Sequence, residues 1–312
     1  MTVGHPLTEQ TQEPRFSGPS DADLETLLLI RHFELTLLDL FARGEVGGTT
    51  HTCLGQEIIP VALAPLLDGD HVFSNHRGHG HYLAHCEDPE GLLAEIIGRE
   101  GAVCAGVGGS QHLHRERYLS TGVQGQTLPI AVGVGLHLVG RGEDRVVVVY
   151  VGDGTWGEGA VYEALNMAGL WRVPLLLVVE DNGIAQSTPT RRQMAGTVAE
   201  RARAFGIPFR SSSTLWVDEL RAEIAPVLDR VRRERTPAVF QVETVRLGPH
   251  SKGDDQRGAE ELERARERDW YVRYERRFGE RFTTIDRRQK ERVSAIVTDV
   301  LARPLSTWEG GR

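Results

Sequence analysis

The sequence predicts an α/β protein with a central, mainly parallel sheet flanked by helices. Two apolar runs of β-branched residues and leucine, at 145–151 (RVVVVYV) and 173–179 (VPLLLVV), are typical of strands buried on both faces. Between them, residues 157–171 repeat apolar side chains at helical spacing. This order of strand, helix and strand indicates a βαβ unit, which joins two parallel strands by a right-handed crossover.

The chain before this unit contains mostly helical patterns. Residues 21–43 place apolar side chains about 3.6 residues apart, and glycines break the pattern directly afterwards. Further helices are predicted at 56–67 and 129–139, and a short strand at 71–74. Residues 101–127 are rich in glycine, and a loop of this length in a compact protein is usually functional or disordered.

The chain after the unit extends the same alternation. Helices are predicted at 197–206 and 218–234, followed by a strand at 238–246 and a charged helical tail from Ala259. We therefore expect one α/β domain with a helical C-terminal extension over residues 21–312. Residues 1–20 are polar and contain proline and glycine, so we expect a flexible tail there.

The composition excludes several classes of protein. The net charge is −8 and no stretch is strongly basic, which argues against nucleic acid as the main partner. The three cysteines form no CxxC pair, so we expect neither a disulfide framework nor a cysteine-based zinc site. No apolar run approaches the roughly 18 residues that span a bilayer, and the first residues lack the apolar segment of a signal peptide. A cytoplasmic protein fits these features.

Two polar segments directly follow the two buried strands. Gly152-Asp153-Gly154 closes the first, and Asp181-Asn182-Gly183 closes the second. Ligands of open α/β sheets bind beyond the carboxyl ends of the strands, so neighbouring strands would bring Asp153 and Asn182 together. Each segment alone could be a simple turn, but both together indicate oxygen ligands for Mg²⁺. The glycines allow close backbone approach, and the next helix can bind a phosphate at its N-terminus.

This arrangement resembles the thiamine diphosphate motif. In this sequence 26 residues, 155–180, separate Gly152-Asp153-Gly154 from Asp181-Asn182. The resemblance implies that Asp153, Asn182 and the backbone carbonyl of Ile184 hold Mg²⁺, and that Gly152 and Gly154 contact the cofactor. Asp181 stands where the family usually has asparagine, at a position that is not a metal ligand.

The resemblance extends from about residue 22 to residue 275. The chain looks like the α subunit of the E1 component of 2-oxo acid dehydrogenase complexes, a family with the thiamine diphosphate-binding fold. The matching stretches, in order, are Gly55-Gln56-Glu57, His76-Arg77-Gly78-His79-Gly80, Gly108-Gly109-Ser110, residues 182–190 (NGIAQSTPT) and His250-Ser251.

Arg77 and His76 are candidate cofactor and catalytic residues. Arg77 is a permanently charged planar donor suited to diphosphate oxygens, and the resemblance assigns it that role. His76 replaces a tyrosine that is usual in the family, and we expect it to face the cofactor or the substrate entrance. His76, His79 and His81 could alternatively form a zinc site, but no acidic or cysteine ligand accompanies them.

Three further residues are assigned by resemblance. Gly122 and Gln124 belong to the segment that contacts the aminopyrimidine ring of the cofactor, and Gln124 replaces a residue that is usually apolar. His250 belongs to a polar loop whose histidine reaches the cofactor, so it is a candidate for both cofactor binding and catalysis. We interpret residues 111–114 (QHLH), in the glycine-rich segment, as structural.

The resemblance also implies a partner. Thiamine diphosphate must form a carbanion, and in the two-chain relatives the required glutamate comes from a β subunit. Glu57 is a conceivable carboxylate of this chain, but the resemblance places it in the α chain's own helix. We expect such a subunit, in an α₂β₂ assembly, and a lipoyl-bearing E2 as acyl acceptor. Two other functions remain open, namely an E2-independent carboligase, acyloin synthase or transketolase-like enzyme, and a non-catalytic cofactor-binding module.

Overall fold

The computed structural model of the protein describes residues 18–251 and 255–307. Its centre is a seven-stranded sheet in the order β2-β3-β1-β4-β5-β9-β8, in which only the β2–β3 pair is antiparallel. The strands are β1 (His71–Ser74), β2 (His114–Arg115), β3 (Tyr118–Ser120), β4 (Val147–Gly152), β5 (Leu175–Asp181), β8 (Phe209–Ser212) and β9 (Ala238–Glu243). A separate hairpin joins β6 (Ile184–Ala185) and β7 (Thr188–Pro189).

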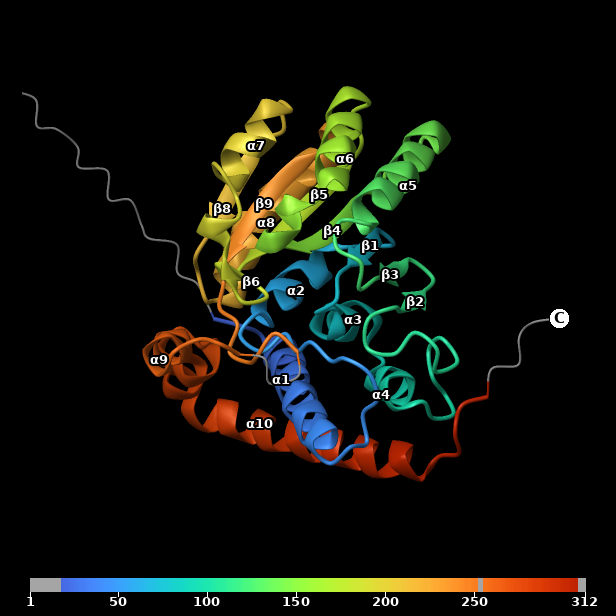
Figure 1. The fold of residues 1–312 in the computed structure, drawn as a ribbon, viewed down its shortest axis with the longest axis vertical. Coiled ribbons are helices and arrows are strands. Elements are labelled where there is room, and N and C mark those ends of the chain that lie inside the picture. The colour runs from blue at the N-terminus through green and yellow to red at the C-terminus, as the bar shows by residue number, and fades with distance from the viewer. Residues whose placement is uncertain (1–17, 252–254, 308–312) are drawn as a thin grey trace, which may run out of the picture.

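Helices cover both faces of the sheet (Figure 1). One face packs against α5 (Thr127–Arg141), α6 (Gly159–Leu170) and α7 (Val198–Ala204). On the other face, α2 (Ile58–Leu63), α3 (His79–Cys86) and α8 (Val217–Glu234) share one core with the sheet. Helices α1 (Asp21–Ala42) and α4 (Pro89–Ile97) pack on the outside of this layer, α10 (Trp270–Ala302) packs against α1 and α4, and α9 (Ala259–Glu267) precedes α10. Single 3₁₀ turns lie at η1 (Ala64–Leu66), η2 (Asp153–Gly157) and η3 (Thr190–Arg192).

Alternate residues of the central strands enter two different cores. In β4, Val148 and Tyr150 belong to the core on the α2 and α8 side, whereas Val147, Val149 and Val151 belong to the core beneath α5 and α6. This alternation follows from the two-residue period of a strand and explains why the run is apolar throughout. The predicted α/β fold class and the βαβ unit are confirmed.

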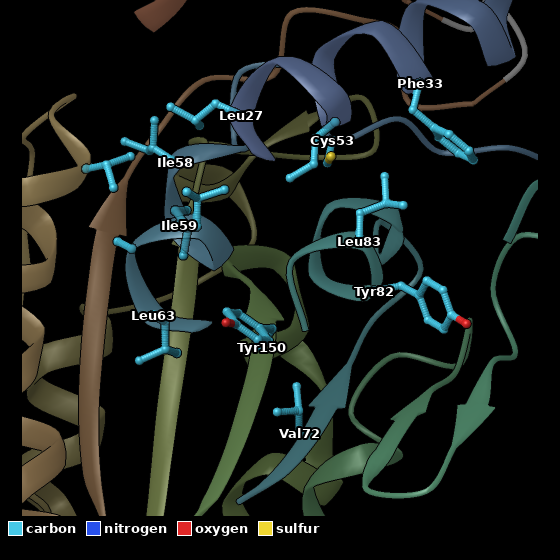
Figure 2. Packing of buried hydrophobic residues seen from close by; sticks show 14 of the residues in the cluster. Leu27, Phe33, Cys53, Ile58, Ile59, Leu63, Val72, Tyr82, Leu83 and Tyr150 are labelled. Carbon is cyan, nitrogen blue, oxygen red and sulfur yellow. The ribbon is translucent and has the colours of Figure 1, made fainter. Parts of the chain in front are cut away.

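The core on the α2 side also holds the loop before that helix in place. Cys53 is buried in the same cluster as Phe33 of α1 and Leu83 of α3 (Figure 2). A side chain at Gly80 would bring its Cβ within 2.8 Å of the Cys53 Sγ atom. Helix α3 can therefore approach this loop closely only because residue 80 is glycine.

The structure corrects several predicted boundaries. The helix after the first buried strand starts at Gly159, following the 3₁₀ turn at 153–157, rather than at Gly157. The predicted helix 56–67 is a helix of six residues continued by a 3₁₀ turn. The strand predicted at 238–246 ends at Glu243. The predicted tail at 1–20 lies outside the described residues except for 18–20, where Ser20 caps α1.

None of the helices described by the structure is long and apolar enough to cross a membrane.

Candidate active site

A cleft of about 410 Å³ opens at the carboxyl ends of β4 and β5. All ten site residues predicted from the sequence line it, namely His76, Arg77, Gly122, Gln124, Gly152, Asp153, Gly154, Asn182, Ile184 and His250. A larger cavity of about 850 Å³ lies between β8 and α8 and contains none of them.

The register of the sheet explains why the two strand ends meet. Strands β4 and β5 are parallel neighbours, with Val151 opposite Val179 and Gly152 opposite Glu180. The residues that follow each strand therefore emerge side by side. Gly154 makes the contact possible, because a Cβ atom there would lie 2.5 Å from the Cβ of Ala185. Residue 154 must therefore be glycine because the segments after β4 and β5 pack closely against each other at the cleft.

Asp153 is a buried carboxylate without a cationic partner among the residues that the structure describes. Its side chain is only 3% exposed, and it accepts a hydrogen bond from the Thr190 hydroxyl. Burial raises the pKa of Asp153 to about 6, although the hydrogen bond from Thr190 opposes this shift. A buried anion of this kind is stabilised by a bound cation.

Asn182 offers a second oxygen at the same edge. Its Nδ2 atom donates to Oε1 of Gln56 at 3.1 Å, and its Oδ1 atom accepts from the Ile184 N–H at 3.2 Å. The neighbouring Asp181 does not line the cleft, because its carboxylate accepts from the Gly183 N–H and from the Gln241 amide, at 3.0 and 2.7 Å.

Arg77 supplies positive charge to the cleft and joins two loops. Its guanidinium donates to the Thr52 carbonyl at 2.7 Å, and to both the carbonyl and Nδ1 of His250 at 3.1 Å. Burial and the nearby charge of Arg246 lower the pKa of Arg77 to about 10, so the side chain stays charged at neutral pH. Both arginines line the cleft.

Three imidazoles gather on the same side of the cleft. The ring of His51 lies 4.7 Å from the ring of His76 and 4.7 Å from the ring of His250, measured between centroids. One nitrogen of each ring lies within 4.8 Å of the others, which is close enough to suggest a metal site.

The neighbours of these rings argue against a metal. Nδ1 of His51 faces the Gln111 amide nitrogen at 3.2 Å, and Nδ1 of His250 faces Arg77. Nδ1 of His76 faces the Gln124 amide nitrogen at 2.7 Å. Metal-binding histidines normally donate their second N–H to an acceptor, whereas each of these rings meets a donor.

The other two histidines of the 76–81 segment have structural partners. His79 and His81 lie in α3, and no group of ligands that joins them to His76 is found in the described part of the chain. Nδ1 of His79 contacts Glu34 at 3.1 Å, and Nε2 of His81 contacts Glu180 at 3.0 Å. Both contacts are buried, and they connect α3 to Glu34 of α1 and Glu180 of β5.

Glu57 is the conceivable catalytic carboxylate of this chain, but both of its oxygens accept hydrogen bonds from other residues of the chain. It is 0% exposed, and its oxygens accept from Arg31, from the Gly55 N–H and from the Trp270 indole, at 2.6, 2.8 and 2.8 Å. Glu57 does not line the cleft.

Several residues that line the cleft were not predicted from the sequence. The most prominent are His51, Gln56, Gln111, Thr155 and Arg246. Gln56 belongs to the Gly55-Gln56-Glu57 stretch and His51 lies just before it, so the match of this stretch to the family pattern is the signal that could have indicated both residues. Gln111, interpreted as structural from the sequence, lies so close to Gly122 that a Cβ there would meet its Oε1 at 2.0 Å.

Comparisons with known proteins place the chain in a family. The model of the family described as "Dehydrogenase E1 component" matches residues 25–301. The chain is 35% identical to a pyruvate dehydrogenase E1 component subunit alpha of Zymomonas mobilis over 257 residues, which cover 78% of this chain and 73% of the relative. It is also 34% identical to the protein of that name from Rhizobium meliloti, with 73% and 67% covered.

A relative with a different name is equally similar. The alpha subunit of an acetoin:2,6-dichlorophenolindophenol oxidoreductase from Cupriavidus necator is 35% identical over 255 residues, covering 77% of each chain. A solved structure from Mycobacterium smegmatis, described as thiamin diphosphate-dependent, has a TM-score of 0.43 and 19% identity, covering 64% of this chain and 33% of that one. This likeness is too weak to define the fold. The sequence relatives and the family model show that the chain belongs to the Dehydrogenase E1 component family.

Proposed function

We propose that this chain is the α subunit of a heteromeric enzyme that uses thiamine diphosphate and Mg²⁺ to decarboxylate a 2-oxo acid. The observation that supports this best is the meeting of Asp153, Asn182 and Arg77 in one cleft at the ends of two parallel strands. The first two offer hard oxygen ligands, and the third offers a fixed positive charge. This donor set fits a metal ion with a diphosphate.

The cofactor would be held by residues on both sides of the cleft. We assign Mg²⁺ to Asp153, Asn182 and the carbonyl of Ile184, and the diphosphate to Arg77 and the backbone at Gly152 and Gly154. We assign Gly122 and Gln124, which line the same cleft, to the contact with the aminopyrimidine ring. When bound, the cofactor would supply a nucleophilic carbon and an electron sink for the decarboxylation of a 2-oxo acid.

His250 and His76 are our candidates for catalysis. Both imidazoles line the cleft, and their rings lie 5.6 Å apart between centroids. Burial, then the charges of Arg77, His51 and His250, lower the pKa of His76 well below its usual value. The neutral ring can therefore orient a reacting oxygen by hydrogen bonding.

A second chain must complete the site. Because Glu57 is committed to three other groups, the glutamate that activates the cofactor would come from a β subunit. We propose an α₂β₂ assembly, to which this chain contributes a single α/β domain with a helical C-terminal extension, residues 21–312. The acyl group would pass from this assembly to a lipoyl-bearing E2. A reducing, cytoplasmic location is consistent with three free thiols among the described residues.

A carboligase, acyloin synthase or transketolase-like subunit that needs no E2 is the second candidate. The observation that favours it is the equal similarity to the subunit named for acetoin oxidation. Acyl transfer to lipoamide would support the dehydrogenase, whereas a new C–C bond formed without lipoamide would support the carboligase.

Native mass spectrometry of the complex purified from its own cells tests the proposal. We expect a second chain of similar mass, with thiamine diphosphate and Mg²⁺ bound. A homo-oligomer that takes up no thiamine diphosphate would overturn the proposal and favour a non-catalytic binding module.

A further inference from the structure

Two cleft residues that differ from the family pattern, His76 and Gln124, contact each other. The amide nitrogen of Gln124 lies 2.7 Å from Nδ1 of His76, and its amide oxygen accepts from the Thr155 hydroxyl at 2.7 Å. The three side chains come from three separate segments of the chain, and all of them line the cleft. Gln124 therefore connects the 3₁₀ turn after β4 to the segment after β1.

This chain of hydrogen bonds fixes the position of the proton on His76. The Gln124 amide is oriented with its oxygen toward the Thr155 hydroxyl and its NH₂ group 2.7 Å from Nδ1 of His76, and an NH₂ group can only donate. Nδ1 is then an acceptor, and a neutral ring carries its proton on Nε2. The lowered pKa of His76 is consistent with a neutral ring. Nε2 has no hydrogen bond to another residue that the structure describes.

We propose that Gln124 and Thr155 are positioning residues that hold His76 as the Nε2–H tautomer, so that its N–H binds an anionic oxygen in the cleft. The surroundings favour such a ligand, because the guanidiniums of Arg77 and Arg246 line the same cleft. The oxygen belongs either to the diphosphate of the cofactor or to the carboxylate of the substrate. This inference rests on the proposed function, which supplies both anions.

The tautomer can be measured without any ligand. In the full chain labelled with ¹⁵N-histidine, long-range ¹H–¹⁵N couplings distinguish a ring protonated at Nε2 from one protonated at Nδ1. We expect the His76 signals, assigned with His76→Leu, to show Nε2–H. Gln124→Glu should move the proton to Nδ1, because a carboxylate accepts where the amide donates.

Variants of His76 separate donation from packing. His76→Gln keeps an N–H donor near the Nε2 position, whereas His76→Leu keeps bulk but donates nothing. A hydrogen bond to a charged group is strong enough that its loss should weaken binding roughly tenfold or more. We expect His76→Leu to show this loss and His76→Gln to recover most of it.

Two measurements on the assembled enzyme distinguish the two anions. A weaker Kd for thiamine diphosphate, measured by calorimetry with Mg²⁺, assigns the N–H to the diphosphate. An unchanged Kd with a raised KM for the 2-oxo acid assigns it to the substrate carboxylate. Gln124→Glu should raise the same constant, Kd or KM, more in the wild-type background than in His76→Leu. The reason is that only the wild-type background contains the imidazole whose proton the substitution moves from Nε2 to Nδ1.

The inference is overturned if His76 carries its proton on Nδ1 in the wild type, or if His76→Leu changes neither the Kd nor the KM. Both results could occur in an enzyme that binds thiamine diphosphate normally, so they would leave the proposed function intact. Failure of the wild-type enzyme to bind thiamine diphosphate would instead overturn the proposed function, while the tautomer measurement would still test the roles of Gln124 and Thr155.

Discussion

Replacing Glu95 by glutamine should release the glycine-rich loop that borders the cleft. Glu95 is 1% exposed. Its Oε2 accepts the N–H groups of Cys104 and Gly106 at 2.6 and 2.9 Å, and its Oε1 accepts those of Gly108 and Gly109 at 2.7 and 3.2 Å. An amide of the same shape turns one oxygen into a donor that faces two N–H groups.

The magnitude follows from these contacts. Each hydrogen bond to a charged group contributes about 1.5–3 kcal/mol, so losing two would cost about 3–6 kcal/mol if the loop stayed in place. The loop can instead open toward water, which limits the loss to the free energy of local opening. We therefore expect a loss of about 3 kcal/mol in urea unfolding, with new proteolytic cleavage between residues 101 and 113.

Glu90→Gln is the matched control for this prediction. Glu90 lies on the same helix, but its side chain is 56% exposed and pairs with Arg303 at the surface. Its replacement should change the free energy of unfolding by no more than about 0.5 kcal/mol. If Glu95→Gln unfolded like Glu90→Gln and resisted protease like the wild type, the loop would not depend on this carboxylate.

Two further predictions concern packing and pH. Gly154→Ala should destabilise the protein by about 1–3 kcal/mol in thermal unfolding, because its Cβ would lie 2.5 Å from the Cβ of Ala185. Gly152→Ala should not destabilise it, because a Cβ there has no other atom within 4 Å. Equal melting temperatures of the two variants would contradict the close approach at Gly154. Burial raises the pKa of Glu34, but the interaction with His79 and the hydrogen bonds from Cys53 together outweigh it, so the pKa of Glu34 is lowered. Its contribution to stability is therefore present above the ordinary glutamate pKa of 4.5 and is lost as the pH falls through the lower pKa of the folded state. Urea unfolding between about pH 6 and 3 should show a shallower acid decline in Glu34→Gln, and parallel declines would contradict the prediction.

The central sheet could be predicted from sequence because its strands are buried on both faces. The runs that became β4 and β5 are apolar throughout, which leaves little alternative to a buried parallel strand. The edge strand β8 (FRSS) was not predicted because it is short, largely polar and partly exposed. Strand β3 was not predicted because it is only three residues long and lies within a glycine-rich stretch. Neither has the periodicity on which the prediction depends.

The position of two polar side chains at the strand ends could be predicted for a related reason. Asp153 and Asn182 directly follow recognisable strands, so the topology of a parallel sheet brings them together. The cluster of His51, His76 and His250 could not be predicted in this way, because its members come from distant loops. Their contact depends on the packing of α3 and on the hydrogen bonds of Arg77.

The start of α3 was also obscure in the sequence. The alternation of histidine and glycine at 76–81 is typical of a loop, since glycine is a poor helix former. The helix forms there because Gly80 allows it to pack on Cys53, and because buried carboxylates bind His79 and His81. These partners lie far away in the sequence and carry no local signal.

The most direct test of a magnesium and diphosphate site compares two carboxylates at the ends of neighbouring strands, Asp153 directly after β4 and Asp181 at the last position of β5. Thiamine diphosphate binding to the purified enzyme is measured by calorimetry, with and without Mg²⁺, for the wild type, Asp153→Asn and Asp181→Asn. We predict Mg²⁺-dependent binding that Asp153→Asn weakens at least about tenfold, and that Asp181→Asn leaves within about threefold, because only Asp153 lines the cleft. Binding to Asp153→Asn with wild-type affinity and the same Mg²⁺ dependence would contradict the account.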